Sequence, residues 1–499
     1  MPPKQLKIFP FSILLLPIFF VWHVANEYFG LIPFSYSARF LFYYFILAIV
    51  LFFIGKLLFR NNIKSGCWTT ILLIIFFFWG AAHDTLRSLH LPAFLSSYKF
   101  LFSTALIIVI LLTVLLRKKN APGKLHRFFT VLFLIFILSE AIISISKFSN
   151  KQLLKNDLAY THNSIPAKLN AIDAGKQPDI FLIIFDEYAS SSSLQQYIGY
   201  NNSVLDSSFL KNGFYIATGS KSNYNSTPLS IASFLDMQYF DKSLEEVVTK
   251  PKLVLQGQYT IRKSIVPSML ERQGYKVLNL GLCDLDNHPA PTESFFNNNA
   301  IEALYLETLW GRIQKEIWWN VQQKTSINWT FLQSSRRVNM PETNLDNLHK
   351  MLAELNTETN TPRFVITHVM MPHKPFFFDK HGNRRGNPYA NDPAIDDSLY
   401  TDQLIYTNTF IDSICQTTRQ QHQRPRVIVI AGDHGYRDKE NTGTRDKQFM
   451  NLNAWYFSDG DYSTLYKSIS PVNSFRIILN KYFSTGLPLL KDSTIRLIE

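Results

Sequence analysis

The run Phe181-Leu-Ile-Ile-Phe185 leads directly into Asp186-Glu187. Far along the chain, Val427-Ile-Val-Ile430 leads into Ala431-Gly-Asp-His-Gly435. Short apolar and β-branched runs of this kind are typical of fully buried strands in a parallel sheet. Ligands of open α/β sheets bind at the carboxyl ends of such strands, where both runs place polar side chains. We therefore expect an α/β domain with a functional site at this edge of its sheet.

The residues at these strand ends are of the types that bind metal. Asp186, Asp433 and His434 would meet at the sheet edge and combine carboxylate oxygen with imidazole nitrogen. This mixture suits a borderline or hard divalent cation, and zinc and manganese both fit it. Glu187 is an alternative to Asp186: adjacent residues of a strand point to opposite faces, but at the strand end either can turn inward.

The N-terminal part of the chain contains five apolar stretches of about the length that crosses a bilayer. They are residues 8–24, 40–59, 67–83, 100–116 and 128–146. The first stretch has a basic start but no small-residue cleavage site, so we interpret it as an uncleaved helix. Residues 1–146 are therefore predicted to form an all-α transmembrane domain of five helices.

The charges of the connecting loops predict the orientation of these helices. Basic residues concentrate after the second and fourth stretches: Lys56, Arg60 and Lys64, and then Arg117, Lys118, Lys119, Lys124 and Arg127. Positive loops stay on the cytoplasmic side, which predicts a cytoplasmic N-terminus and an extracytoplasmic chain after residue 147. These loops explain part of the net charge of +12, and no zinc-finger, RNP-type or helix-turn-helix signature points to nucleic acid.

The rest of the chain divides into a linker and one large domain. Residues 147–178 are polar and predict a linker, whereas residues 179–499 alternate strand-like with helical patterns. This alternation favours a mainly parallel sheet covered by helices. Strands are expected at 180–185, 275–280, 363–369 and 426–431, and helices at 228–236, 299–322, 343–355 and 402–417.

A candidate nucleophile lies in Ser222-Asn-Tyr-Asn-Ser-Thr-Pro-Leu-Ser230. Thr227 is a favourable N-cap and Pro228 suits the first helical position, so the Thr227 hydroxyl is expected at a helix N-terminus. Free N–H groups there favour a phosphate or an alkoxide, and an adjacent divalent cation would make the hydroxyl a nucleophile. A plain capping role is commoner for such a threonine, and only the metal-type residues elsewhere favour catalysis.

Two histidines mark the end of the strand-like run Phe364-Val-Ile-Thr-His-Val369. His373 follows the run in a turn, where an imidazole can contact a phosphate oxygen or protonate a leaving group. His368 lies inside the run and is interpreted as a packed core histidine. Lys374 is interpreted as a solvated loop charge.

These four segments, in this order and behind five apolar stretches, resemble the alkaline phosphatase and sulfatase superfamily. They resemble in particular its membrane branch, the lipoteichoic acid synthases and phosphoethanolamine transferases. Asp186-Glu187 and Gly432-Asp-His-Gly435 resemble the two metal-ligand motifs of that branch. Thr227 takes the place of the nucleophile, and His373-Lys-Pro-Phe376 resembles the substrate-contacting motif. The resemblance implies a C-terminal α/β sulfatase-like domain behind the membrane helices.

The sequence departs from the membrane branch in three ways. The branch usually has a single Glu where this chain has Asp186 and Glu187. The wider superfamily places a metal-binding Asp directly after the strand, which favours Asp186. A phosphate-contacting His found downstream in some relatives has no clear match, and Arg445 or Lys447 is an alternative. The multiple disulfides common in phosphoethanolamine transferases are also missing.

The resemblance also implies a set of site residues and a reaction. Asp186, Thr227, Asp433 and His434 would hold one or two divalent ions, zinc or manganese, with Thr227 catalytic and His373 binding substrate. The implied protein is a metal-dependent membrane phosphotransferase. It would move a phosphoethanolamine- or phosphoglycerol-type head group from a phospholipid to an envelope glycan or lipid, through a covalent Thr227 intermediate. The implied location is a bacterial-type cytoplasmic membrane, with the catalytic domain periplasmic or extracellular.

Two alternative functions stay open on the same residues. One is a membrane-anchored phosphodiesterase, phosphatase or sulfatase-type hydrolase that transfers the group to water. The other is a protein without catalysis that binds glycan or senses the state of the envelope.

Some segments of the large domain have more than one interpretation. Residues 297–323 carry Trp310, Trp318 and Trp319. One interpretation places them on the membrane interface, and the other packs them into the domain core. The core is preferred because aromatic stripes usually belong to a core. Residues 281–288 and the basic loop 381–388 are candidates for a pocket wall and a lid.

Overall fold

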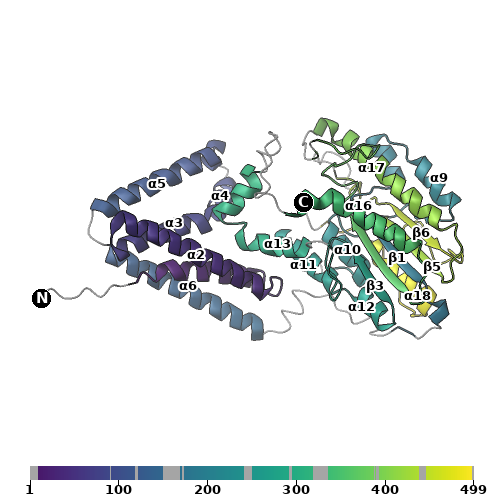
Figure 1. The fold of residues 1–499 in the computed structure, drawn as a ribbon, viewed down its shortest axis with the longest axis horizontal. Coiled ribbons are helices and arrows are strands. Elements are labelled where there is room, and N and C mark those ends of the chain that lie inside the picture. Colours follow the sequence, from purple (N-terminus) through teal and green to yellow (C-terminus); the bar gives the residue numbers. More distant parts are fainter. Residues whose placement is uncertain are drawn as a thin grey trace. The chain divides into compact units, whose positions relative to one another are not determined.

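The computed structural model describes residues 9–89, 92–118, 122–149, 169–170, 174–240, 250–291, 295–318, 335–386, 388, 393–437 and 446–496. The chain forms two compact units (Figure 1). The helical unit comprises residues 1–157 and 298–327, and the sheet unit comprises residues 158–297 and 328–499.

Apolar helices build the helical unit. Three of them are long and apolar enough to cross a membrane: α2 (Phe34–Phe59), α5 (Tyr98–Lys118) and α6 (Gly123–Ser149). Helices α3 (Asn62–Phe77) and α4 (Trp79–Ser88) are bent by 53° and make a fourth span if they count as one. Helix α1 (Ser12–Glu27) is apolar but has only 16 residues. Within the described ranges, the structure thus supports three to four of the five predicted spans.

Helices α1 and α6 run in the same direction. The ring of Phe19 in α1 lies 5.0 Å from that of Phe136 in α6, and Phe29 just after α1 lies 4.9 Å from Phe148 near the end of α6. The contacts therefore advance along both helices together. The C-terminal ends of α1 and α6 lie at one end of the helical unit.

A segment from the middle of the sequence completes the helical unit. It contains most of α13 (Phe295–Tyr305), helix α14 (Leu309–Arg312) and the π-helical turn η5 (Ile313–Trp318). The preferred interpretation, in which the tryptophans of this segment pack into the core of the large domain, is wrong for Trp310 and Trp318, and Trp319 lies outside the described residues. Tyr305 instead stacks on Phe40 of α2, with ring centroids 6.0 Å apart.

The sheet unit contains a six-stranded sheet in the order β2-β6-β5-β1-β4-β3. The four predicted strands are present as β1 (Asp179–Phe185), β3 (Lys276–Leu280), β4 (Arg363–Val369) and β5 (Arg426–Gly432), and they run parallel. Two further strands are antiparallel: β6 (Asn453–Phe457) pairs with β5, and β2 (Tyr215–Ile216) pairs with β6. The sheet is therefore mixed, and parallel pairing is limited to β5, β1, β4 and β3.

Helices cover both faces of the sheet because its central strands are apolar on both faces (Figure 1). In β1, alternate residues pack into two separate cores: Ile180, Leu182 and Ile184 into one, and Phe181, Ile183 and Phe185 into the other. Burying each such side chain stabilises the fold by about 1.5–3 kcal/mol. The first core includes residues of α10 (Thr227–Asp236), α11 (Lys250–Arg262), α12 (Ile265–Arg272) and α18 (Pro471–Phe483). The second includes residues of α9 (Ser203–Lys211), α16 (Ser335–Leu355) and α17 (Pro393–Thr417).

The register of the parallel strands creates one functional edge. Phe185, the last residue of β1, pairs with Val369 of β4 and with Gly432 of β5. The segments that follow these three strands, which carry the polar residues of the site, therefore begin at the same level. Helix α10 adds its N-terminal turn at this level, because the Ser230 hydroxyl donates a hydrogen bond to the Asp433 carbonyl.

Candidate active site

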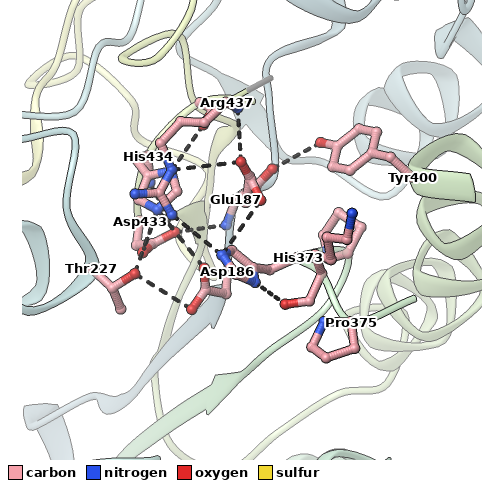
Figure 2. Close-up of polar contacts among 12 residues, drawn as sticks. Asp186, Glu187, Thr227, His373, Pro375, Tyr400, Asp433, His434 and Arg437 are labelled. Atoms are coloured by element: carbon pink, nitrogen blue, oxygen red, sulfur yellow. Dashed lines mark hydrogen bonds and ion pairs between the residues drawn. The ribbon is translucent and has the colours of Figure 1, made fainter. Parts of the chain in front are cut away.

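Side chains from two strand ends and one helix start converge at this edge (Figure 2). Asp186 follows β1, Thr227 begins α10, and Asp433 and His434 follow β5. These are the four residues that the sequence assigned to a metal. Asp186, Asp433 and His434 are at most 2% exposed, whereas Thr227 is half-buried. Thr227 is therefore the most accessible of the four.

The carboxylates of Asp186 and Glu187 point to different neighbours (Figure 2). Asp186 Oδ2 accepts from Thr227 Oγ1 at 3.5 Å, and Asp186 Oδ1 lies 3.8 Å from His434 Nε2. Glu187 has a φ of +62°, and its Oε1 accepts from the Arg437 backbone N–H at 2.7 Å. A residue other than glycine in this left-handed region destabilises the fold by about 1 kcal/mol or more. The turn therefore places Asp186 beside the candidate nucleophile and Glu187 beside Arg437.

Backbone N–H groups orient Asp433. Its Oδ1 accepts from the backbone N–H of Glu187 at 2.8 Å and from that of His434 at 2.9 Å. Its Oδ2 is buried without a hydrogen-bond partner, 3.4 Å from His434 Nε2. His434 Nδ1 donates to the Gly435 carbonyl at 2.8 Å. The neutral imidazole therefore presents the lone pair of Nε2 to the carboxylates.

The two glycines of this motif allow close backbone approaches. A Cβ atom at Gly432 would lie 2.2 Å from the Tyr188 carbonyl oxygen, and one at Gly435 would lie 2.1 Å from the Lys447 carbonyl oxygen. Both distances are far below van der Waals contact, which begins at about 3.5 Å between carbon atoms. Any larger residue would push the strand end and its ligand-type side chains out of place.

The prediction that Thr227 caps its helix is wrong by one residue. Ser226 is the N-cap of α10, Thr227 is the first helical residue, and no side-chain hydrogen bond caps this end. The Thr227 hydroxyl instead lies 3.5 Å from Asp186 Oδ2 and 3.4 Å from His434 Nε2. It is thus directed to the acidic cluster and not to the backbone of its own helix.

His368 also belongs to this cluster, although the sequence suggested a packed core histidine. It is 2% exposed, and its Nε2 lies 3.3 Å from Asp186 Oδ2 without a hydrogen-bond partner. Ligand atoms of Asp186, His368 and Asp433 all lie within 4.8 Å of one another. The missing signal was strand register. His368 pairs with Ile184, and the strand period of two places Asp186 on the same side as Ile184.

The separations within the cluster fit a tetrahedral cation site. Zinc bonds of about 2.0–2.1 Å to nitrogen or oxygen place neighbouring ligand atoms about 3.3 Å apart. Three separations are close to this value: His368 Nε2 to Asp186 Oδ2 at 3.3 Å, His434 Nε2 to Asp433 Oδ2 at 3.4 Å, and Thr227 Oγ1 to His434 Nε2 at 3.4 Å. Asp186 Oδ1, Asp433 Oδ2 and His368 Nε2 are also buried without hydrogen-bond partners, which is costly unless another group binds them. The residues present therefore fit a divalent cation.

Burial and neighbouring charges shift the ionisation of the cluster. Burial, followed by the charge of Asp186, raises the pKa of Asp433 to about 6. Burial, followed by the charge of Arg437, lowers the pKa of His434 to about 3 and keeps the imidazole neutral. Burial opposes the ionisation of Asp186, but nearby imidazoles, His373 first, bring the pKa of Asp186 below its usual range. An anionic carboxylate beside a neutral imidazole is the protonation state that metal ligands need.

His373 lies in the turn after β4, beside Glu187 and Arg437. Its backbone N–H donates to the Asp186 carbonyl at 3.1 Å, and its Nδ1 donates to the Lys374 carbonyl. Nε2 is then an acceptor, and Arg437 Nη2 donates to it at 3.2 Å. Glu187 Oε2 lies 3.6 Å from the same nitrogen. The turn therefore holds His373 in contact with the ends of both β1 and β5.

Arg437 is the second site residue that sequence reasoning missed. Its Nη1 donates to the Asn225 carbonyl at 3.2 Å, in the segment that leads to Thr227. Its side chain is 32% exposed, and its Nε lies 3.6 Å from Glu187 Oε1. A partly exposed guanidinium beside an imidazole is well suited to bind an anion. Its position soon after the Gly432-Asp-His-Gly435 motif was the available signal.

Other residues that the sequence singled out have partners away from this cluster. Lys374 pairs with Asp396 at 2.9 Å, so it is not a solvated loop charge. Lys447 is buried, with its Nζ 5.8 Å from the centre of the Tyr197 ring. Arg445 lies outside the described residues. Further pairs involve the segments 281–288 and 381–388: Ala290 N with Asp284 at 2.9 Å, Arg384 with Glu342 at 2.6 Å, and Arg385 with Asp402 at 2.5 Å.

Comparison with known proteins identifies one family model and several distant structures. The model described as Sulfatase matches residues 178–468. No curated protein matches the sequence. The C-terminal periplasmic domain of EptC from Escherichia coli, in complex with zinc, is 13% identical with a TM-score of 0.40, covering 65% of this chain and 91% of that chain. Lipooligosaccharide phosphoethanolamine transferase A from Neisseria meningitidis, an integral membrane protein, is 11% identical with a TM-score of 0.38, covering 93% and 95%. Phosphonate monoester hydrolase of Agrobacterium radiobacter is 11% identical with a TM-score of 0.36, covering 60% and 74%.

Proposed function

Because the chain belongs to the sulfatase family, whose model matches residues 178–468, we propose that it is a metal-dependent membrane phosphotransferase. The family match confirms the predicted resemblance to the alkaline phosphatase and sulfatase superfamily. The proposed reaction moves a phosphoethanolamine- or phosphoglycerol-type head group from a phospholipid to an envelope glycan or lipid. One observation carries the proposal: the Thr227 hydroxyl lies 3.5 Å from Asp186 Oδ2 and 3.4 Å from His434 Nε2 in a chain with membrane-type helices.

The proposed cofactor is one or two divalent cations, zinc or manganese. Asp186, His368, Asp433 and His434 would hold it, and their buried unpartnered atoms support this assignment. Such a cation supplies Lewis acidity, which lowers the pKa of a bound hydroxyl and offsets charge on a phosphoryl group. Thr227 Oγ1, 3.5 Å from Asp186 Oδ2 and 3.4 Å from His434 Nε2, would complete the ligand set as the activated hydroxyl.

In the first half-reaction, Thr227 Oγ1 attacks the phosphorus of the donor phosphodiester. A bond forms between Oγ1 and phosphorus, and the bond between phosphorus and the diacylglycerol oxygen breaks. The hydroxyl of Thr227 loses its proton, and the departing oxygen gains one, so diacylglycerol leaves as an alcohol. The head group stays on Thr227 as a phosphodiester.

In the second half-reaction, an acceptor hydroxyl attacks the same phosphorus. The bond to Thr227 Oγ1 breaks, the acceptor loses its proton and Thr227 regains one. The enzyme is restored and the acceptor carries the head group. Water in place of the acceptor would give the hydrolase alternative with the same residues.

Arg437 would bind the non-bridging phosphate oxygens, and His373 would bind them with its proton moved to Nε2 as Arg437 turns to the substrate. Arg437 is partly exposed and already donates to His373 Nε2 at 3.2 Å. Charge-assisted hydrogen bonds of this type stabilise the charge on a transferring phosphoryl group. Glu187 would act by position, because its Oε1 accepts from the backbone N–H of Arg437.

The proposed setting is a bacterial-type cytoplasmic membrane. The N-terminus would be cytoplasmic, and the sheet unit would lie outside; the proposed catalytic domain is residues 179–499 without the segment 298–327 that joins the helical unit. Residues 147–178 would be the linker. A phospholipid donor explains why a phosphotransferase of this family carries membrane-type helices.

Mass spectrometry of the chain purified from membranes tests this function, with metal content measured in the same sample. We expect a phosphoethanolamine or phosphoglycerol adduct on Thr227 and a bound divalent ion. The Thr227→Ala variant is the control and should bind the ion without forming an adduct. Full head-group transfer by Thr227→Ala would exclude the covalent mechanism. Products formed with and without an acceptor then distinguish a transferase from a hydrolase.

A further inference from the structure

Residues 298–318 lie in the middle of the sheet unit's sequence but fold into the helical unit. Among the described residues, 295–297 before this segment and 335–386 after it belong to the sheet unit. We call residues 298–318 the excursion. The two units are therefore connected through the excursion as well as by the chain that follows α6. None of these residues contributes to the cluster around Thr227.

Contacts with α2 hold the first part of the excursion. The Tyr44 hydroxyl donates to the Leu304 carbonyl at 2.8 Å, and Tyr44 is 5% exposed. Phe40, one turn earlier in α2, stacks on Tyr305. Because Leu304 is fully buried, this end of α13 is packed against α2 and not merely near it.

Contacts with α4 hold the second part of the excursion. The Gly80 backbone N–H donates to the Glu307 carbonyl at 2.8 Å. A Cβ atom at Gly80 would lie 2.3 Å from Glu307 Oε2 and 2.7 Å from Arg312 Nε. This close approach of the excursion to α4 therefore depends on a residue without a side chain.

Arg312 is the centre of this contact. Its side chain is 8% exposed, and it pairs with Asp84 of α4 at 2.5 Å, with Glu307 at 2.8 Å and with Glu316 at 3.0 Å. A buried guanidinium needs such partners, because an unpaired buried charge is strongly unfavourable. Asp84 is the only one of the three carboxylates outside the excursion, so it fixes the excursion to α4.

The place of the contact is informative. Phe40 and Tyr44 lie in the first half of α2, which begins shortly after the end of α1. The end of α1 lies beside the end of α6, from which the chain continues to the sheet unit. The excursion is therefore docked toward the end of the helical unit at which α6 ends.

We propose that residues 298–318 are a docking element that holds the sheet unit at the membrane helices and thereby favours a phosphodiester in the membrane over one in solution. A second attachment restricts the volume that the sheet unit can explore, which raises the effective concentration of a substrate confined to the membrane. This inference rests on the proposed function for its substrate. It does not depend on which head group is transferred.

The test compares two substrates in the full chain reconstituted into vesicles of phosphatidylethanolamine and phosphatidylglycerol. Turnover of the vesicle lipid is measured beside hydrolysis of soluble bis(4-nitrophenyl) phosphate. Gly80→Ala and Arg312→Ala disrupt the contact, and Tyr44→Phe is a milder change that removes one hydrogen bond. Gly123→Ala is the matched control, because a Cβ atom at Gly123 would have no atom within 4 Å.

We expect Gly80→Ala and Arg312→Ala to lower lipid turnover about tenfold and to change soluble hydrolysis by less than about twofold. Tyr44→Phe should have a smaller effect of the same kind, and Gly123→Ala should have none. A parallel loss with both substrates would overturn the proposal and indicate that the contact only stabilises the protein. Unchanged lipid turnover in all three variants would also overturn it.

Amide hydrogen exchange separates failure of this inference from failure of the proposed function. If the wild type acts on neither substrate, the proposed function fails, and docking is judged by exchange alone. Arg312→Ala should speed exchange in 298–306 and leave α10 unchanged, whereas Gly123→Ala should change neither. Unchanged exchange in 298–306 would show that the contact with α4 does not hold the segment, which overturns docking.

Discussion

His368 and His373 belong to one strand-to-turn segment but have different chemical surroundings. His368 Nε2 lies 3.3 Å from Asp186 Oδ2 in a fully enclosed position. His373 Nε2 accepts from Arg437, and its side chain is 25% exposed. The first histidine is therefore placed to hold a cation and the second to meet a substrate.

This difference predicts separable effects of His368→Gln and His373→Gln. We expect His368→Gln to weaken metal binding by at least about 100-fold, the upper end for groups that only support a ligand. His373→Gln should keep the metal and lower kcat about 100-fold, as loss of one donor to a reacting oxyanion does. Competition with a zinc chelator measures the first effect, and steady-state kinetics measures the second. Equal metal content in both variants would contradict the role given to His368.

At the scale of elements, α10 joins the site to the core of the sheet unit. It begins at Thr227 and ends at Asp236, whose Oδ1 accepts from the backbone N–H of Ile265 at the start of α12. Asp236 is 2% exposed. Burial raises the pKa of Asp236 to about 7, although this hydrogen bond opposes the shift. The link between α10 and α12 therefore depends on pH.

We expect Asp236→Asn to flatten the pH dependence of stability. The carboxyl titrates near 3.8 in the unfolded chain and near 7 in the folded chain, so the folded state binds more protons between these values. Raising the pH through this window therefore lowers the free energy of unfolding, by up to a few kcal/mol at about 1.4 kcal/mol per pKa unit. Asn keeps the acceptor oxygen but has no charge. The melting temperature of the wild type should fall more between pH 4 and pH 8 than that of Asp236→Asn, and equal falls would contradict the assignment.

The strands differ in how far local sequence predicts them. Runs such as Phe181–Phe185 are apolar on both faces, and the parallel strands β1, β3, β4 and β5 were expected close to their observed bounds. The strand Asn453-Ala-Trp-Tyr-Phe457 was not expected, although it completes the sheet beside β5. This short strand is difficult to recognise from the sequence of the surrounding segment alone. Its antiparallel pairing is fixed by contact with β5 and not by its own pattern.

At the scale of the whole molecule, the charge pattern of the loops makes a prediction about topology. Lys118 at the end of α5 should be cytoplasmic, and Ser207 in α9 should be outside. Both residues are exposed, and the native cysteines Cys67, Cys283 and Cys415 are buried and form no disulfide. In intact cells, a membrane-impermeant maleimide should label Ser207→Cys and leave Lys118→Cys unlabelled until the membrane is opened. The reverse pattern would invert the proposed orientation.

The helical unit shows where hydropathy alone falls short. Apolar length identified α2, α5 and α6 as spans, because burial in a bilayer needs only a sufficiently long apolar helix. Hydropathy did not reveal the 53° bend between α3 and α4. It also did not reveal that Arg312, far along the chain, packs on Gly80.

The sequence by itself determined the membrane-type helices, the family, the parallel strands and the four residues Asp186, Thr227, Asp433 and His434 that the structure brings together. Each of these is carried by a local pattern: an apolar run, or polar residues directly after a strand or before a helix. Only the tertiary structure decided that His368 faces Asp186, that Arg437 contacts His373, and that residues 298–318 fold against α2 and α4. These contacts join residues that are distant in sequence, and they depend on strand register and on close packing. Neither strand register nor close packing can be read from a local pattern of side chains.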